Sequence, residues 1–348
     1  MAATLDLQFD VVSLQQYLQE HLECVGPLSM EKFAGGQSNP TYRITSASGQ
    51  RYVLRKKPAG KLLDSAHAVD REFRITRALH GAGFPVAKPH LFCADESVIG
   101  TPFYVMDFID GRVLRDQSLP GMTHRERAAI WDELNRVIAE LHSLNYQALG
   151  LEDYGKKGSY LARQVSRWSR QYLATETEPI EAMDRLIHWL PDHIPASDET
   201  SMVHGDFRLE NLILHHREQR VLAVLDWELS TLGHPLADLA YTALSWHLPA
   251  NLFGGMAALD LGSLGIPTES EFVKKYCARA GRTGIDEDTW RYCVAYNLFR
   301  VAAIAQGIAK RAMDGNAAST AAEEVGRTAR PIADLGWAVV ERITATRR

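Results

Sequence analysis

One segment near the middle of the chain constrains it more than any other. Residues 204–211 read HGDFRLEN, and LDWE follows at residues 225–228. Between them, two short apolar runs flank a polar turn, a pattern that predicts a β-hairpin. Such a hairpin would bring Asn211 and Asp226 back together. The segment therefore predicts a polar site built around a short β-ribbon.

The residue types in this segment suit phosphoryl transfer. Asp206 can accept a hydrogen bond from a substrate hydroxyl, while Asn211 offers an amide oxygen and Asp226 a carboxylate to a metal. Mg²⁺ prefers hard oxygen ligands and usually keeps one or two carboxylates besides phosphate oxygens. Arg208 adds a permanent positive charge suited to the γ-phosphate as it transfers. Together these groups predict an ATP- and Mg²⁺-dependent kinase.

The part of the chain before this segment alternates strand and helix patterns. Residues 30–55 read as three strands joined by a Gly-rich turn and a second turn. Helical periodicity follows at 69–79, and apolar runs at 89–94 and 101–108 predict two more strands. A capping box that begins at Ser13 predicts a leading helix. These elements make a compact α+β unit of about 100 residues.

The rest of the chain is mostly helical. Apolar residues at helical spacing over 130–144 and 290–308 predict two long helices. We therefore predict an α+β, two-lobed fold, in which the N-lobe has an antiparallel sheet with one helix and the C-lobe is helical apart from the hairpin. The predicted boundaries are an N-lobe at 1–107, a hinge at 108–111 and a C-lobe at 112–348.

Net charge and hydropathy limit the classes of partner that the chain is expected to bind. A formal net charge of −5 provides no general attraction to nucleic acid or to an anionic membrane surface. No apolar stretch reaches the ~20 residues that span a bilayer, and the N-terminus has no positively charged region before an apolar core. We expect a cytoplasmic protein with a small-molecule substrate. The four cysteines lack CxxC spacing and are expected to be buried small hydrophobes.

HGDFRLEN followed by LDWE resembles the catalytic and metal-binding motifs of the aminoglycoside phosphotransferase and choline kinase superfamily, distant relatives of protein kinases. The resemblance implies a protein-kinase-like fold, with Asp206 as the catalytic residue and Asn211 and Asp226 as metal ligands. The segment HPLADLA resembles the family's segment after the metal Asp, which implies that Asp238 braces the catalytic loop. We interpret His204 as structural.

Two further segments resemble the nucleotide site of this family. FAGGQSN at 33–39 resembles the nucleotide-positioning loop, in which glycines let the backbone approach phosphate, although the same turn could simply close a hairpin. MDFIDG at 106–111 resembles the interlobe hinge, whose apolar residues sandwich adenine. The predicted nucleotide contacts are Gly35, Gly36, Ser38, Asn39, Met106 and Phe108.

Arg55 departs from the family pattern. It ends the strand YVLR, where the family and the protein kinases have a phosphate-contacting Lys, and Glu72 stands where the partner Glu is expected. An Arg can contact phosphate and pair with Glu72, but it is not an equivalent point charge. Strand alternation would turn Lys56 to the opposite face and leave Lys57 as the substitute. Glu228 could reach the metal region or serve a surface or capping role.

The acceptor is predicted from charge and from resemblance. Polycationic aminoglycosides need carboxylates, but residues 246–265 carry a single acid, which suits an acceptor with a hydrophobic portion. GGQSNPTY and LDWELSTLGHPLADLAY resemble the kinase-like domain associated with acyl-CoA dehydrogenases. That implies a hydroxyacyl-CoA acceptor and a functional association with such a dehydrogenase. Arg300 and Arg311 are candidate contacts for its phosphates, with salt bridges as the alternative.

Two other functions compete with a small-molecule kinase. A catalytically silent nucleotide-binding scaffold with the same fold would commonly lack a member of the Asp206, Asn211 and Asp226 set, which is complete here. A protein kinase is disfavoured because the sequence has neither a GxGxxG loop nor an APE-like segment after Asp226. The sequence therefore favours a small-molecule kinase.

Overall fold

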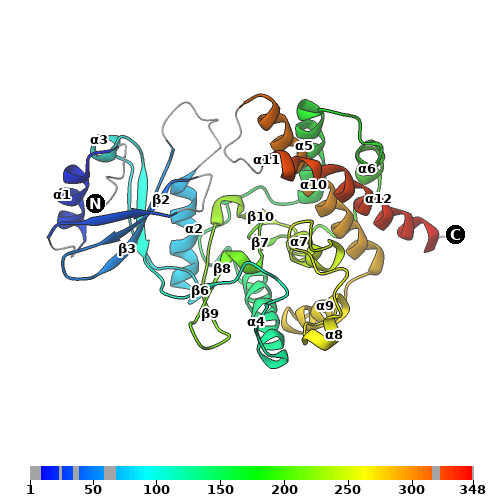
Figure 1. Ribbon diagram of the computed structural model, residues 1–348, viewed down its shortest axis with the longest axis horizontal. Helices are drawn as coiled ribbons and strands as arrows, with labels where there is room; N and C mark the ends of the chain where they lie inside the picture. The colour runs from blue at the N-terminus through cyan, green and yellow to red at the C-terminus, as the bar shows by residue number, and fades with distance from the viewer. Residues whose placement is uncertain (1–8, 23–25, 34–38, 59–67, 316–321, 347–348) are drawn as a thin grey trace. The chain divides into compact units, whose positions relative to one another are not determined.

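The computed structural model describes residues 9–22, 26–33, 39–58, 68–315 and 322–346. The chain divides into two compact units (Figure 1). The first comprises Met1–Arg112, Ile213–His216 and Leu222–Glu228, and the second comprises Val113–Leu212, Arg217–Val221 and Leu229–Arg348.

The first unit is built on a five-stranded antiparallel sheet of order β1-β2-β3-β5-β4. Its strands are β1 (Ser29–Lys32), β2 (Thr41–Thr45), β3 (Arg51–Lys56), β4 (Pro89–Cys93) and β5 (Phe103–Asp107). Tyr42 and Ile44 of β2 are buried while their neighbours along the strand are half-buried, because successive side chains point to opposite faces. The strands predicted for this part of the chain are confirmed.

Three helices accompany this sheet: α1 (Val11–His21), α2 (Val69–Gly81) and α3 (Glu96–Ile99). Helix α2 packs against β4 and β5, while Leu14 and Leu18 of α1 join the apolar core of this unit. The capping box predicted from Ser13 is wrong. The cap is Asp10, whose carboxylate accepts a hydrogen bond of 2.8 Å from the backbone nitrogen of Val12, so the helix begins before Ser13.

The predicted β-hairpin is present. It consists of β8 (Leu212–Leu214) and β9 (Val221–Val224), and the short strand β6 (Arg112–Val113) adds a third strand in the order β6-β8-β9. Single turns of 3₁₀ helix, at Leu209–Asn211 and Trp227–Leu229, lie directly before β8 and shortly after β9.

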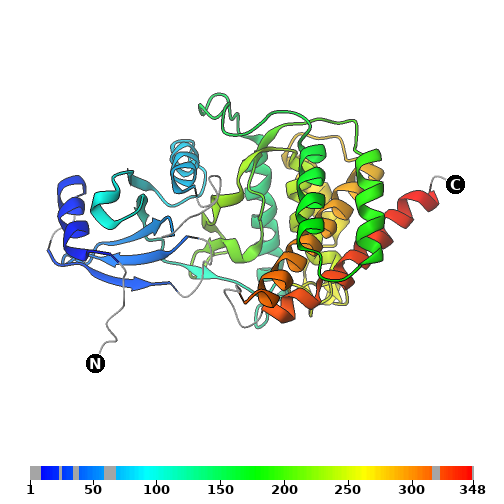
Figure 2. The same cartoon turned by 90° about the horizontal axis from the view of Figure 1, so that it is seen from above.

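The second unit is mainly helical. Its helices are α4 (His124–Ser143), α5 (Tyr160–Thr175), α6 (Glu181–Asp192), α7 (Pro235–His247), α8 (Leu261–Leu264), α9 (Glu269–Arg279), α10 (Glu287–Met313), α11 (Ala322–Arg327) and α12 (Ala329–Thr346). Helix α10 packs against α5, α7, α11 and α12. Figure 2 shows α5 and α6, both green, side by side. Strand β7 (Ser201–Val203) pairs with β10 (Thr231–Gly233) in antiparallel fashion.

The two long helices predicted from apolar periodicity correspond to α4 and α10. A capping box begins α4, in which Thr123 and Glu126 each bind the other's backbone. Cys93, Cys277 and Cys293 are buried free thiols, as expected, while Cys24 lies outside the described residues. Over the described ranges, none of the helices combines the length and the apolar character needed to cross a membrane.

Candidate active site

The loop that carries Asp206 begins directly after β7, and its geometry depends on Gly205. This glycine has φ +84°, and a Cβ atom there would lie 2.9 Å from the carbonyl oxygen of Leu229. Any side chain would meet both a left-handed backbone and a collision with fixed backbone. The glycine of the HGD motif is therefore required by the turn that presents Asp206.

Asp206 is held by side chains from its own loop. The Nδ2 atom of Asn211 donates to the Asp206 carbonyl at 2.8 Å and to Oδ2 of its carboxylate at 3.0 Å. The Nε atom of Arg208 lies 3.3 Å from Oδ1, and Arg208 also pairs with Glu210. Neither contact of Asn211 involves its amide oxygen, the atom that suits Mg²⁺. These contacts therefore leave the amide oxygen of Asn211 chemically suited to a cation.

Asp238, in the first turn of α7, hydrogen-bonds to the backbone of the same loop. Its carboxylate accepts hydrogen bonds from the backbone of His204 at 2.8 Å and of Gly205 at 2.7 Å, and it lies 3.1 Å from Nε2 of His142. Burial alone would raise the pKa of Asp238, but the bonds from His142 and His204 outweigh it and lower the pKa. The Nδ1 atom of buried His204 accepts from the backbone nitrogen of Asp206 at 3.2 Å.

Arg300 lies behind the catalytic loop. It is buried in α10, its Nη2 atom donates to the carbonyl of Gly205 at 2.7 Å, and its guanidinium lies 4.9 Å from the ring centre of Tyr241. This geometry supports the loop and gives no support to the predicted substrate contact. Arg311 is exposed near the C-terminal end of the same helix.

Tyr241 was missed by the sequence analysis. Burial and, after it, the nearby Asp206 carboxylate raise the pKa of Tyr241 far above its ordinary value. The phenol therefore stays protonated and can donate to Asp206. Its place in α7, 35 positions after Asp206 in the chain, leaves no local pattern that could have predicted the contact.

The first unit holds a second cluster of charges, centred on Arg55. Its guanidinium lies 2.7 Å from Glu72, 2.9 Å from Asp226 and 3.5 Å from Glu228. Burial alone would lower the pKa of Arg55, but these carboxylates raise it, Glu72 most strongly, so the guanidinium is charged. The predicted pairing of Arg55 with Glu72 is present, and Glu228 joins it.

Two further donors complete the surroundings of Glu72. The Nδ2 atom of Asn39 donates to it at 2.6 Å, and the hydroxyl of Tyr104, which stands opposite Arg55 in the β3–β5 register, donates at 3.1 Å. Because a buried carboxylate needs such donors, the side chain of Asn39 is committed to Glu72 instead of facing outward to phosphate. The contact with Tyr104 depends on strand register, which the sequence does not specify.

Asp226 has an unusual backbone. Its φ is +65°, in the left-handed region that residues other than glycine seldom adopt, although Asp tolerates it better than most. Its side chain remains 37% exposed while one oxygen contacts Arg55. A second carboxylate oxygen is therefore available to a cation, and such local strain is typical of functional positions.

The remaining predicted nucleotide residues are spread over the first unit. Gly35, Gly36 and Ser38 lie outside the described residues. Met106 is half-buried in β5, and the ring of Phe108 lies 4.6 Å from the guanidinium of Arg51. Lys56 is buried on the sheet face opposite Arg55, near the ring of Phe9, as strand alternation predicts.

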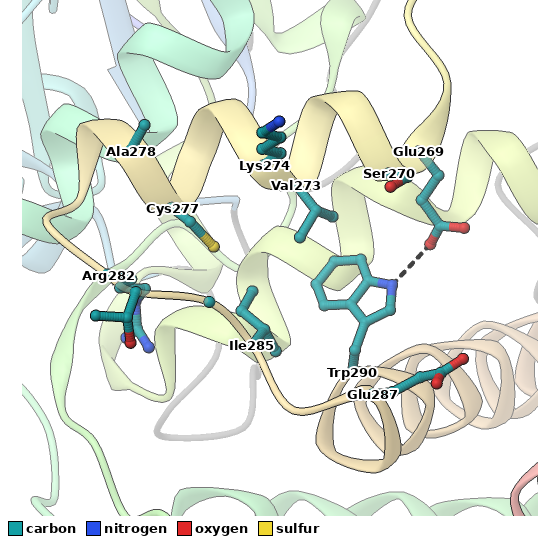
Figure 3. Close-up of a pocket in the computed structure, with 12 residues that line it drawn as sticks. Glu269, Ser270, Val273, Lys274, Cys277, Ala278, Arg282, Ile285, Glu287 and Trp290 are labelled. Carbon is teal, nitrogen blue, oxygen red and sulfur yellow. Dashed lines mark hydrogen bonds between the residues drawn. The ribbon is translucent and has the colours of Figure 1, made fainter.

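A cavity of 610 Å³ lies elsewhere in the second unit, between α9 and the start of α10. Figure 3 shows Val273, Cys277, Ile285 and Trp290 facing one another around it, with Trp290 bonded to Glu269 at 2.8 Å. None of the residues that line it belongs to the predicted site.

The model of the phosphotransferase enzyme family matches residues 29–272, a range that includes β1, β2, the loop that carries Asp206 and the Asp226 segment. The chain belongs to this family. Its fold is kinase-like, as the resemblance of the motifs implied.

Two curated relatives that the chain matches are longer proteins. The chain is 48% identical to mouse acyl-CoA dehydrogenase family member 10 over 329 residues, covering 93% of this chain and 30% of that protein. It is 44% identical to rat acyl-CoA dehydrogenase family member 11 over 352 residues, covering 97% of this chain and 44% of that protein. The chain thus spans less than half the length of either relative.

Solved structures agree with this family. A Ralstonia eutropha protein described as a candidate aminoglycoside phosphotransferase is 51% identical, with a TM-score of 0.88 and coverage of 96% of this chain and 99% of that one. A spectinomycin phosphotransferase solved with ADP and spectinomycin is 14% identical (TM-score 0.62; 95% and 98% covered). A Cryptosporidium parvum choline kinase is 11% identical (TM-score 0.65; 97% of each chain covered). The last two likenesses concern the fold alone.

Proposed function

We propose that this chain transfers the γ-phosphoryl group of ATP, with Mg²⁺, to a hydroxyl of a small molecule. The observation that carries the proposal is the Asp206 carboxylate, which Asn211 and Arg208 contact while Asp238 fixes the preceding backbone. A carboxylate held in advance is what a phosphoryl-transfer site needs, because most of the catalysis is positioning and electrostatic stabilisation.

In this proposal each motif residue has one task. Asp206 orients the acceptor hydroxyl and accepts its proton as that oxygen bonds to the γ-phosphorus and the bond from phosphorus to ADP breaks. Arg208 stabilises the charge on the transferring group. The amide oxygen of Asn211 and the carboxylate of Asp226 would hold Mg²⁺, which neutralises phosphate charge when bound.

The first unit would bind the nucleotide. Arg55 takes the place of the phosphate-contacting Lys, and Glu72 orients it. Gly35, Gly36, Ser38 and the backbone of Asn39 are proposed to approach the phosphates, and Met106 and Phe108 to border adenine. Glu228, 3.5 Å from Arg55, is proposed to position that guanidinium.

For the acceptor, we propose a hydroxyacyl thioester of coenzyme A. The relatives named acyl-CoA dehydrogenase family members 10 and 11 support this class, since they contain a region similar to nearly all of this chain. A functional association with an acyl-CoA dehydrogenase follows from the same likeness. Arg311, an exposed cation, remains the proposed contact for the coenzyme A phosphates.

One observation favours a second candidate, a silent nucleotide-binding scaffold. Arg55 pairs with Asp226 at 2.9 Å and so partly neutralises a predicted metal ligand. Against it stands the complete set of Asp206, Asn211 and Asp226, which a silent relative would have no need to keep.

The test is ADP release from Mg-ATP with a panel of 3- and 4-hydroxyacyl-CoA thioesters, choline, sugars and aminoglycosides. We expect acceptor-dependent release that Asp206→Ala reduces by about 10²- to 10⁴-fold while nucleotide binding persists. The exposed Asp192→Ala is the matched control. Nucleotide binding without release from any acceptor would support the scaffold instead.

A further inference from the structure

A small cavity of 40 Å³ in the second unit borders the residues that contact Asp206. Arg208, which contacts that carboxylate, lines the cavity together with Tyr241 and the polar side chains of Gln117, Thr242 and Ser245. Leu244, Leu248, Phe253 and Val301 supply an apolar wall. The described residues that line it include no Asp or Glu.

Phe253 stands out in this wall. It is 42% exposed, and its φ of +52° places a bulky residue in the left-handed region. Phe253 and Gly254 are the central residues of a turn, closed by the 3.2 Å hydrogen bond from the backbone nitrogen of Gly255 to the carbonyl of Leu252, and both have the positive φ that such a turn requires. The turn leaves the ring of Phe253 partly exposed in the lining of the cavity, where a ligand can contact it.

Backbone hydrogen bonds fix the loop that carries Phe253 to α7 and to Leu248, the residue that follows this helix. The backbone nitrogen of Met256 donates to the carbonyl of Ser245, and that of Ala257 donates to the carbonyl of Leu248 at 3.0 Å. A Cβ atom on Gly255 would lie 1.9 Å from the same Leu248 carbonyl. The wall is therefore held in place before any ligand arrives.

We infer that this cavity is the acceptor subsite and that it takes a short alkyl group attached to the carbon that bears the reacting hydroxyl. This inference rests on the proposed function and deepens it. The cavity has room for about two or three groups of the size of a water molecule, which corresponds to a short alkyl chain. Because Arg208 is the only charged residue among the described residues that line it, the cavity suits a neutral or anionic acceptor and disfavours a polycation.

The test varies the alkyl group of the acceptor and the side chains that form the wall of the cavity. Hydroxyacyl-CoA thioesters whose alkyl group beyond the hydroxyl carbon has one to six carbons are compared by kcat/KM. The wild-type protein should favour the short members. Phe253→Ala and Val301→Ala, which both enlarge the cavity, should each shift the ratio of long to short acceptors about tenfold toward long ones.

Leu173→Ala, another exposed hydrophobic position, is the control and should leave the ratio unchanged. Binding of the matching acyl-CoA thioesters without the hydroxyl, measured by calorimetry, should shift in the same direction. If the acceptors are phosphorylated but neither Phe253→Ala nor Val301→Ala changes the ratio of long to short acceptors, the subsite is overturned. The proposed function would still stand in that case. Turnover of aminoglycosides alone would overturn the subsite, and no ADP release from any acceptor would overturn both.

Discussion

The Oδ1 atom of Asp238 accepts a hydrogen bond of 2.7 Å from the backbone nitrogen of Gly205, directly before the proposed catalytic residue. Its Oδ2 atom accepts a second from the backbone of His204. One buried carboxylate thus fixes two consecutive peptide groups, and α7 sets the position of the loop that carries Asp206.

Asp238→Asn should destabilise the protein by about 1–3 kcal/mol, because the amide nitrogen cannot accept one of these two bonds. Since the folded-state pKa of Asp238 is lowered, its carboxylate contributes stability above about pH 4 that is lost as the pH falls through the folded-state pKa. Urea denaturation at pH 7 and over a series of pH values below about 4 measures both effects, with Asp192→Asn as control. Equal midpoints for wild type and variant at pH 7 would contradict this role.

Arg55→Met should destabilise the first unit by about 3–5 kcal/mol, because Glu72 would be left buried without its charged partner. Arg55→Lys should retain part of this stability and also bind nucleotide. Denaturation and Mg-ATP titration provide the two measurements, and the exposed Arg125→Met is the control. If Arg55→Met proved as stable as wild type, the ion pair would have no structural importance.

Asp226→Asn should abolish most of the dependence of ATP affinity on Mg²⁺. Asn also tolerates the left-handed backbone at this position, so the change removes charge with little added strain. The experiment is an ATP titration with and without Mg²⁺ for wild type, Asp226→Asn and Asp192→Asn. An undiminished Mg²⁺ effect in Asp226→Asn would remove it from the proposed metal site.

Arg300→Met should lower kcat about tenfold to a hundredfold with little change in the KM for ATP, because the support of the Gly205 carbonyl is lost. If Arg300 instead contacted the acceptor, the KM for the acceptor would rise while kcat stayed near the wild-type value. Steady-state kinetics in both substrates, with Arg125→Met alongside, separates the two roles.

Local patterns predicted the elements well, since they depend on neighbouring residues. The strands of the first unit and the long helices α4 and α10 follow from apolar spacing. The start of α1 was misplaced because Ser13 and Asp10 are both suitable caps within one turn, and only the folded helix shows that Asp10 accepts the bond.

The sequence by itself determined the family, the hairpin and the residue types of the site, because these reside in contiguous motifs whose spacing is readable along the chain. Tertiary structure alone decided which distant groups support those motifs. Tyr241 reaches Asp206 and Arg300 reaches Gly205 through the packing of α7 and α10. Tyr104 reaches Glu72 through strand register. These contacts join residues separated by 32 to 95 positions, and no local rule encodes which side chains such packing brings together.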